Sequence, residues 1–196
     1  MVPEGAVPLG PGGGTPVAFH KENTTVQTHR SSRILAAIAV GGAIVGVLDA
    51  IDATVALHLA VGLQPIPIYQ FVASGLLGPS AFAGGVATAL LGLVLHFFIA
   101  LGAATTFVLA ATRLPALIRN PIPWGLAFGV GVWLFMGLVV LPLSRVQRSP
   151  FHLGLLINGI VGHALLVGLP IALAARRFLG DRRAEAPARA RTPAPA

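Results

Sequence analysis

Four long apolar runs constrain this chain more than any other feature of its sequence. They cover about residues 34–62, 81–111, 124–143 and 151–175. Each run reaches the ~20 residues that a helix needs to cross the hydrocarbon core of a bilayer. In lipid, the backbone N–H and C=O groups of a segment must form hydrogen bonds with one another, as they do in a helix. Runs of this length are typical of such helices. The sequence therefore predicts an all-α integral membrane bundle of four transmembrane helices.

The composition excludes a soluble domain. Hydrophobic residues make up 55% of the 196 residues and charged residues only 10%, which is less than half of the ~25% that is usual in soluble domains. A small soluble fold cannot hide so much apolar surface. The absence of Cys excludes disulfide scaffolds, Cys-based zinc sites and c-type haem. No nucleotide-binding fingerprint and no G-x-S-x-G elbow occurs, so we predict no catalytic residue and do not expect an enzyme.

A shorter apolar stretch separates the first two runs. Residues 69–77 are too few to span a bilayer. Pro65 and Pro67 precede the stretch, and we expect no helix across them. The sequence predicts a short interfacial or re-entrant helix here, with Tyr69 at the level of the lipid headgroups.

The two ends of the chain lack the material of a core. Residues 1–33 begin with a Pro/Gly tract and continue with polar residues, and residues 179–196 are rich in Ala, Pro and Arg. Such compositions bury too little apolar surface to fold. We expect two disordered tails around a transmembrane domain at residues 34–178, and we expect residues 1–30 and 181–196 to be dispensable for insertion and folding.

The net charge of +7 reflects membrane topology and not nucleic-acid binding. The basic residues flank the apolar runs and form no folded basic face of the kind that reads nucleic acid. With four spans, 11 of the 13 Lys and Arg fall on the side of the two termini, and only Arg145 and Arg148 fall on the other. The positive-inside rule then predicts a bacterial inner (cytoplasmic) membrane protein with both termini in the cytoplasm. The expected partner is the lipid bilayer.

Several short motifs carry a resemblance to a known family. They are Gly46–Asp49, Gln70–Gly78, Ala81–Gly85, Gly92–Phe97, Val140–Ser144 and His163–Ala172. The stretch from Gly46 to Arg177, about two thirds of the chain, resembles a bacterial family of four-span inner-membrane proteins whose activity is uncharacterised. The resemblance implies a four-helix membrane fold. It implies no activity, so no catalytic role is carried over.

Four ionisable side chains lie deep within the predicted spans. Asp49 is near the middle of the first run, and Asp52 follows three residues later on a similar face. His96 and His163 lie near the middle of the second and fourth runs. Such groups cost several kcal/mol in hydrocarbon unless they are paired, neutralised or wetted. We predict that Asp49, His96 and His163 meet in one polar centre, with Asp52 one turn further outward.

Three functions fit such a centre. We expect first a structural Asp/His network that fixes the register of the helices. Proton-coupled or small-solute transport is the alternative, because carboxylates and histidines at this depth are the usual parts of proton relays. The second alternative is a b-type haem or a metal ion held by His96 and His163, although we predict no cofactor.

Glycine and proline suggest two further features. The Gly125-xxx-Gly129 pair is a small-xxx-small pattern, so a homodimer through Gly-rich helix faces is one expectation. Gly168 and Pro170 predict a bend in the fourth span.

Overall fold

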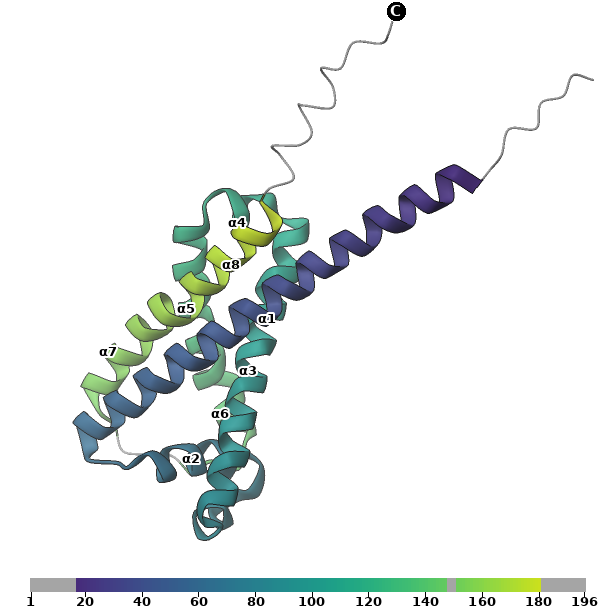
Figure 1. The fold of residues 1–196 in the computed structure, drawn as a ribbon. Helices are drawn as coiled ribbons and strands as arrows, with labels where there is room; N and C mark the ends of the chain where they lie inside the picture. The colour runs from purple at the N-terminus through teal and green to yellow at the C-terminus, as the bar shows by residue number, and fades with distance from the viewer. Residues whose placement is uncertain (1–16, 148–150, 181–196) are drawn as a thin grey trace, which may run out of the picture. The chain divides into compact units, whose positions relative to one another are not determined.

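The protein is described here by a computed structural model that covers residues 17–147 and 151–180 (Figure 1). Within these ranges the regular structure is entirely helical, so the all-α prediction is confirmed. Residues 1–16, 148–150 and 181–196 lie outside the described residues. Most of the predicted tail at residues 179–196 is therefore not described.

Four helical segments of the described chain are long and apolar enough to cross a membrane. They are Thr28–Val61, Gly85–Arg113, Pro121–Leu143 and Leu153–Leu179. These segments match the four predicted runs. The chain is therefore a multi-pass membrane protein of the predicted all-α, four-helix type.

The helices follow one another with short connections. The first span lies in α1 (Val17–Val61), which α2 (Pro65–Leu77) and the 3-10 turn η1 (Gly78–Ala83) connect to the second span, α3 (Gly85–Arg113). The short α4 (Pro115–Arg119) leads to the third span, formed by α5 (Pro121–Phe135), η2 (Met136–Val140) and α6 (Leu141–Leu143). The fourth span consists of α7 (Leu153–Gly162), η3 (His163–Gly168) and α8 (Leu169–Leu179).

Helix α1 begins earlier than the sequence predicts. It starts at Val17, so residues 17–33 are helical where we expected a disordered tail. Neither Gly nor Pro occurs between Val17 and Arg33, so nothing in this stretch ends a helix. The chain divides into two units, residues 1–32 and 33–196, at almost the predicted start of the transmembrane domain. In the first unit, the Ser32 hydroxyl donates to the His29 carbonyl at 2.9 Å.

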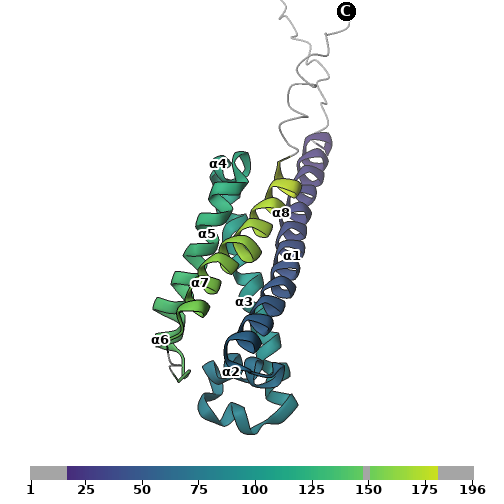
Figure 2. The ribbon, with the colours of Figure 1, turned by 90° about the vertical axis from the view of Figure 1, so that its left-hand side faces the viewer.

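Helix α2 is the predicted short helix, but it also begins earlier than expected. It starts at Pro65, and its 13 residues are too few to cross a bilayer. Proline is tolerated in the first turn because the N–H groups there have no partner within the helix. Helix α2 lies across one end of the second unit (Figure 2). It packs so closely on α3 that a Cβ atom at Gly92 would clash with the Tyr69 carbonyl oxygen.

Small residues let the spans approach one another. Ala37, Ala100 and Ala104 are buried in the core beside the larger Phe107 and Ile171. Phe107, Val108 and Ile171 are among the largest fully buried side chains. Close approach of this kind is how membrane helices gain packing energy, because lipid is as apolar as their side chains.

The Gly125-xxx-Gly129 pair serves contacts inside the chain. A Cβ atom at Gly125 would lie 3.0 Å from the Gly168 carbonyl oxygen, and one at Gly129 would lie 2.7 Å from the Cα atom of Ala164. The third span therefore packs backbone to backbone on the fourth at these two glycines. The expected homodimer stays a prediction.

A π-helical segment precedes the proline in each of the last two spans. Segment η2 ends two residues before Pro142, and η3 ends two residues before Pro170. In both, the residue just before the proline donates its N–H to the carbonyl five residues back. Proline has no N–H, and its ring crowds the carbonyl four residues before it, so the wider π turn relieves that crowding. The predicted distortion at Gly168 and Pro170 takes this form.

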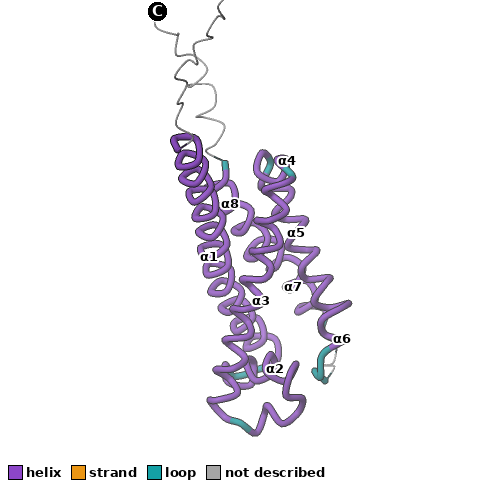
Figure 3. The backbone as a smooth tube through the Cα atoms, turned by 90° about the vertical axis from the view of Figure 1, so that its right-hand side faces the viewer, coloured by secondary structure: helices purple, strands orange, loops and turns teal. Residues whose placement is uncertain are grey.

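The described basic residues of the second unit gather at one end. Arg33 donates from Nε to the Phe178 carbonyl at 2.7 Å, so the start of this unit lies beside the end of α8. Ile118 of α4 lies beside Gly180 at the same end, and α2 and α6 lie at the other (Figure 3). The first end carries Arg33, Arg113, Arg119, Arg176 and Arg177, and the α2 end carries Arg145.

Candidate polar site between the spans

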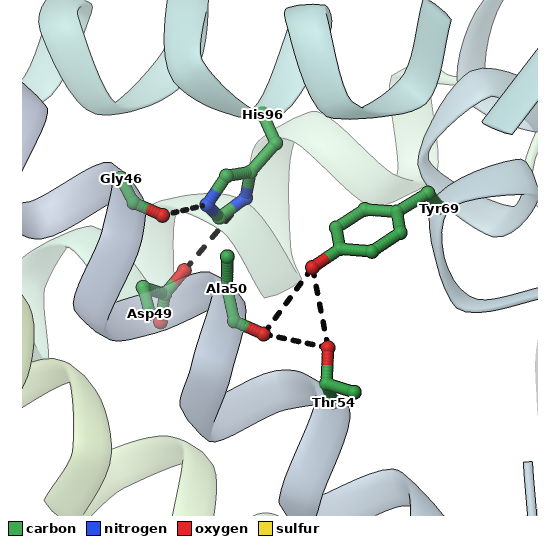
Figure 4. A network of polar contacts seen from close by, with 6 residues as sticks. All are labelled: Gly46, Asp49, Ala50, Thr54, Tyr69 and His96. Carbon is green, nitrogen blue, oxygen red and sulfur yellow. Dashed lines mark hydrogen bonds and ion pairs between the residues drawn. The ribbon is translucent and has the colours of Figure 1, made fainter. Parts of the chain in front are cut away.

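The structure brings Asp49 of α1 and His96 of α3 together (Figure 4). His96 Nδ1 lies 3.9 Å from Asp49 Oδ2, which is an ion-pair distance and longer than a direct hydrogen bond. His96 Nε2 donates to the Gly46 carbonyl oxygen at 3.0 Å. Gly46 lets α3 come this close to α1, because a Cβ atom at Gly46 would clash with the ring of Phe97, the residue after His96. Only 15% of the His96 side chain and 20% of the Asp49 side chain are exposed.

The geometry fixes one proton of this pair. A carbonyl oxygen only accepts, so His96 Nε2 must carry a proton, and Nδ1 is the nitrogen that faces Asp49. The 3.9 Å between Nδ1 and Oδ2 is an electrostatic contact without a direct hydrogen bond.

Asp49 and His96 line a cavity of about 100 Å³. His163 of η3 lines the same cavity, so three of the four predicted site residues surround one space. The other lining residues are apolar and come from α2 and all four spans: Val45, Val72, Ile99, Ala100, Ala103, Val132, Met136 and Val167. One water molecule needs roughly 10–15 Å³ of such volume, so the cavity has room for several.

His163 has the least satisfied polar atom of the site. Its Nδ1 atom is buried and has no hydrogen-bond partner among the described residues. The backbone at His163 is held firmly, because a Cβ atom at Gly129 would lie 2.7 Å from the His163 carbonyl carbon. Buried polar atoms are nearly always hydrogen-bonded, so an orphaned ring nitrogen beside a cavity needs an explanation.

Asp52 belongs to a different contact. Asn158 of α7 donates from Nδ2 to Asp52 Oδ2 at 2.9 Å, and a Cβ atom at Gly162 would lie 2.7 Å from that oxygen. Asp52 is not among the residues that line the cavity. It therefore joins α1 to α7, about one turn from the polar centre. Asn158 is not among the residues that the sequence predicted for the site, although an Asn five residues before His163 in an apolar span is itself a signal.

Tyr69 joins α2 to α1 beside the same site. Its hydroxyl lies 3.2 Å from Thr54 Oγ1 and donates to the Ala50 carbonyl oxygen at 3.4 Å (Figure 4). Thr54 Oγ1 donates to the same carbonyl at 2.7 Å. The hydroxyl of Tyr69 is thus engaged within the chain, at the residue after Asp49, and its predicted depth at the headgroups stays a prediction. The sequence could not show this, because the contact depends on how α2 lies against α1.

The residues around the cavity do not fit a haem or a metal ion well. No group of three or more His, Asp or Glu among the described residues could hold a metal ion. Both ring nitrogens of His96 already face a partner. The cavity is also smaller than the ~300 Å³ at which small-molecule pockets usually begin.

Comparison of the chain with protein family models, with curated proteins and with solved structures found no match. The predicted resemblance to a bacterial four-span family therefore stays a prediction.

Proposed function

We propose that this is a bacterial inner-membrane protein whose Asp49, His96 and His163 handle a proton in the proton-coupled transport of a small solute. The observation that carries the proposal is the position of the Asp49–His96 pair on a cavity that His163 also lines. Release of a proton from the pair leaves the Asp49 carboxylate ionised, and the cavity beside it has room for water that would solvate the charge.

The orphaned Nδ1 of His163 favours this function over a structural network. A network that only fixes helix register gains most when every buried polar atom has a partner. At this site one imidazole nitrogen has none, and the adjoining cavity has room for water. His163 also lines this cavity, and its imidazole is the third proton-carrying group of the proposed relay.

The test compares two conservative substitutions on the same helix. Asp49→Asn keeps the shape and hydrogen-bonding capacity of the side chain but cannot take up or release a proton. Asp52→Asn is the matched control, because its carboxylate bonds to Asn158 outside the cavity. Both variants are reconstituted in liposomes with an internal pH-sensitive dye and an imposed pH gradient.

We expect Asp49→Asn to lower the proton flux at least about tenfold. The loss of a group that transfers protons usually lowers a rate by more than that. Asp52→Asn should retain most of the flux. If the two variants pass protons at the same rate as the unchanged protein, Asp49 is structural and the proposal is wrong.

We further propose that both termini lie in the cytoplasm. In the second unit, five described Arg lie at the end shared by Arg33 and Phe178, and Arg145 lies at the α2 end, which is the asymmetry of cytoplasmic and external loops. The chain has no Cys, so single cysteines report cleanly.

Two exposed positions test the orientation in whole cells. A membrane-impermeant thiol reagent should label Gln64→Cys at the start of α2 without disrupting the cells. It should label Asn120→Cys, at the start of α5, only after permeabilisation. The opposite pattern would reverse the topology.

A further inference from the structure

Three exposed arginines from three different helices lie at the α4 end of the second unit. They are Arg113, the last residue of α3, Arg119, the last residue of α4, and Arg176, in the last turn of α8. An Arg in the last turn of a helix can bond to the terminal carbonyl groups. None of these three guanidinium groups forms a hydrogen bond or an ion pair with another residue that the structure describes.

The packing of α4 brings these arginines together. A Cβ atom at Gly180 would lie 3.6 Å from Ile118 Cγ2 of α4, and the Gly180 N–H donates to the Arg176 carbonyl at 2.8 Å. Arg119, the residue after Ile118, therefore lies beside the end of α8 that carries Arg176. Helix α4 begins only two residues after Arg113. These three arginines form one cluster, the arginine cluster.

The charge of the arginine cluster is not offset by acidic groups nearby. Among the described residues of the second unit, the acidic side chains are Asp49 and Asp52, and both lie within the first span. Arg33 and Arg177 lie at the same end as the cluster and add to its charge. The sequence after Gly180 adds two acidic residues but four Arg. This end of the protein therefore attracts anions.

The arginine cluster lies at the depth of lipid phosphates. Helix α3 has 29 residues, so it is about 43 Å long at 1.5 Å per residue. A bilayer with its headgroup regions is ~40–45 Å thick. Because Arg113 is the last residue of this span, its guanidinium group reaches the headgroup region, where phosphate is the most abundant anion.

Apolar side chains are exposed beside the cluster. Leu114, Ile122 and Trp124 are each about half exposed. Such side chains gain nothing from contact with water, whereas at a membrane interface they enter the boundary between headgroups and acyl chains, where Trp is enriched. This surface therefore fits a molecule that carries both a phosphate and hydrocarbon chains, and not a soluble anion or an acidic protein.

We infer that the arginine cluster binds the headgroup phosphate of an anionic phospholipid, whose acyl chains lie against the apolar residues beside α4. A guanidinium group is always charged, and its planar fork of donors matches the oxygens of a phosphate. A zwitterionic lipid carries the same phosphate, but its own cation cancels the charge, so the cluster prefers a lipid with a net negative headgroup. This inference does not depend on the proposed proton transport.

The test uses Trp124 as a local reporter. The chain has two Trp, so Trp133→Phe leaves Trp124 as the only one, and the signal that Trp124→Phe removes from the unchanged protein is a second measure of the same site. The full-length protein is reconstituted in mixtures of phosphatidylglycerol and phosphatidylcholine, one of which carries brominated acyl chains that quench nearby Trp.

Quenching across the mixtures gives the relative affinity of the two lipids for this surface. We expect phosphatidylglycerol to be preferred at least about fivefold, which is the contribution of one basic side chain near a membrane surface. Equal quenching by the two lipids would overturn the inference.

Arginine substitutions give a matched comparison. Arg113→Gln, Arg119→Gln and Arg176→Gln each remove one positive charge from the cluster, and Arg145→Gln, the control, removes one at the α2 end. All four side chains are exposed, so the packing of the spans should not change. Each cluster variant should lower the preference and the triple variant should abolish it, whereas the control should leave it unchanged. A preference that survives in the triple variant, or that falls as far in the control, would refute the site.

Inorganic phosphate distinguishes a lipid headgroup from a free anion. Sodium phosphate and sodium chloride at the same ionic strength screen the cluster alike, so both should weaken the preference for phosphatidylglycerol equally. A larger loss with phosphate than with chloride would show that the cluster takes a soluble anion, and would overturn its assignment to a lipid.

Discussion

Adding one methyl group at Gly129 should separate the third and fourth spans. A Cβ atom there would clash with the His163 carbonyl oxygen and would lie 2.7 Å from the Cα atom of Ala164, about 0.7 Å short of the 3.4 Å at which ordinary contact begins. These are backbone atoms, so no side chain can rotate away. The helices themselves must move apart, and His163 moves with them.

The matched control lies two residues further along the same helix. At Gly131 the added Cβ atom meets nothing within 4 Å, so Gly131→Ala should be neutral or stabilising by up to ~1 kcal/mol, the helix preference of Ala over Gly. Overpacking at a rigid contact costs about 1–3 kcal/mol, and we expect Gly129→Ala at the upper end of that range because Gly168 packs on the same backbone.

Thermal unfolding in detergent, followed by circular dichroism, measures the difference between the two variants. A chain of this size loses about 2–4 °C of Tm per kcal/mol, so Gly129→Ala should unfold well below both Gly131→Ala and the unchanged protein. Equal Tm values for the two variants would refute the close approach of the spans at Gly129.

Three further substitutions test other contacts by the same unfolding assay. Gly92→Ala should detach α2 at the Tyr69 carbonyl and lower the Tm, whereas Gly102→Ala in the same helix should not. Asn158→Leu should cost about 1–3 kcal/mol by leaving Asp52 without its donor, and adding Asp52→Leu should recover much of that loss. Tyr69→Phe should cost only about 0.5–1.5 kcal/mol, the net value of a hydrogen bond; a cost above that range would show that the hydroxyl contributes more than one hydrogen bond.

The sequence predicted the spans well because length and hydropathy are local properties. A run of ~20 apolar residues has few alternatives to a membrane helix, whatever its neighbours do. The local prediction failed at α2 and at the start of α1. Pro65 lies in the first turn of α2, where proline is tolerated, so it does not break the helix. Residues 17–33 are polar, but no Gly or Pro among them ends a helix.

The sequence predicted how far along their spans the site residues lie, but not the directions in which their side chains point. The positions of Asp49, His96 and His163 in three different spans placed them at one level, and the structure puts all three around one cavity. The sequence could not tell that Asp52, on nearly the same face as Asp49, would bond to Asn158 instead. Two residues three apart differ in direction by about 60° on a helix, which is enough to face different neighbours.

The amino-acid sequence by itself determined that this chain is an all-α membrane protein with four spans and ionisable groups at mid-depth, because hydropathy and length act residue by residue along the chain. Only the tertiary structure decided which helix meets which: the third span packs on the fourth at Gly129, and α2 packs on α3 at Gly92. It also left open space beside Gly131. Glycines in apolar spans look alike in the sequence. Whether one is a close contact or an opening depends on the rotation of two helices about their axes, and that rotation is set by the packing of the whole bundle.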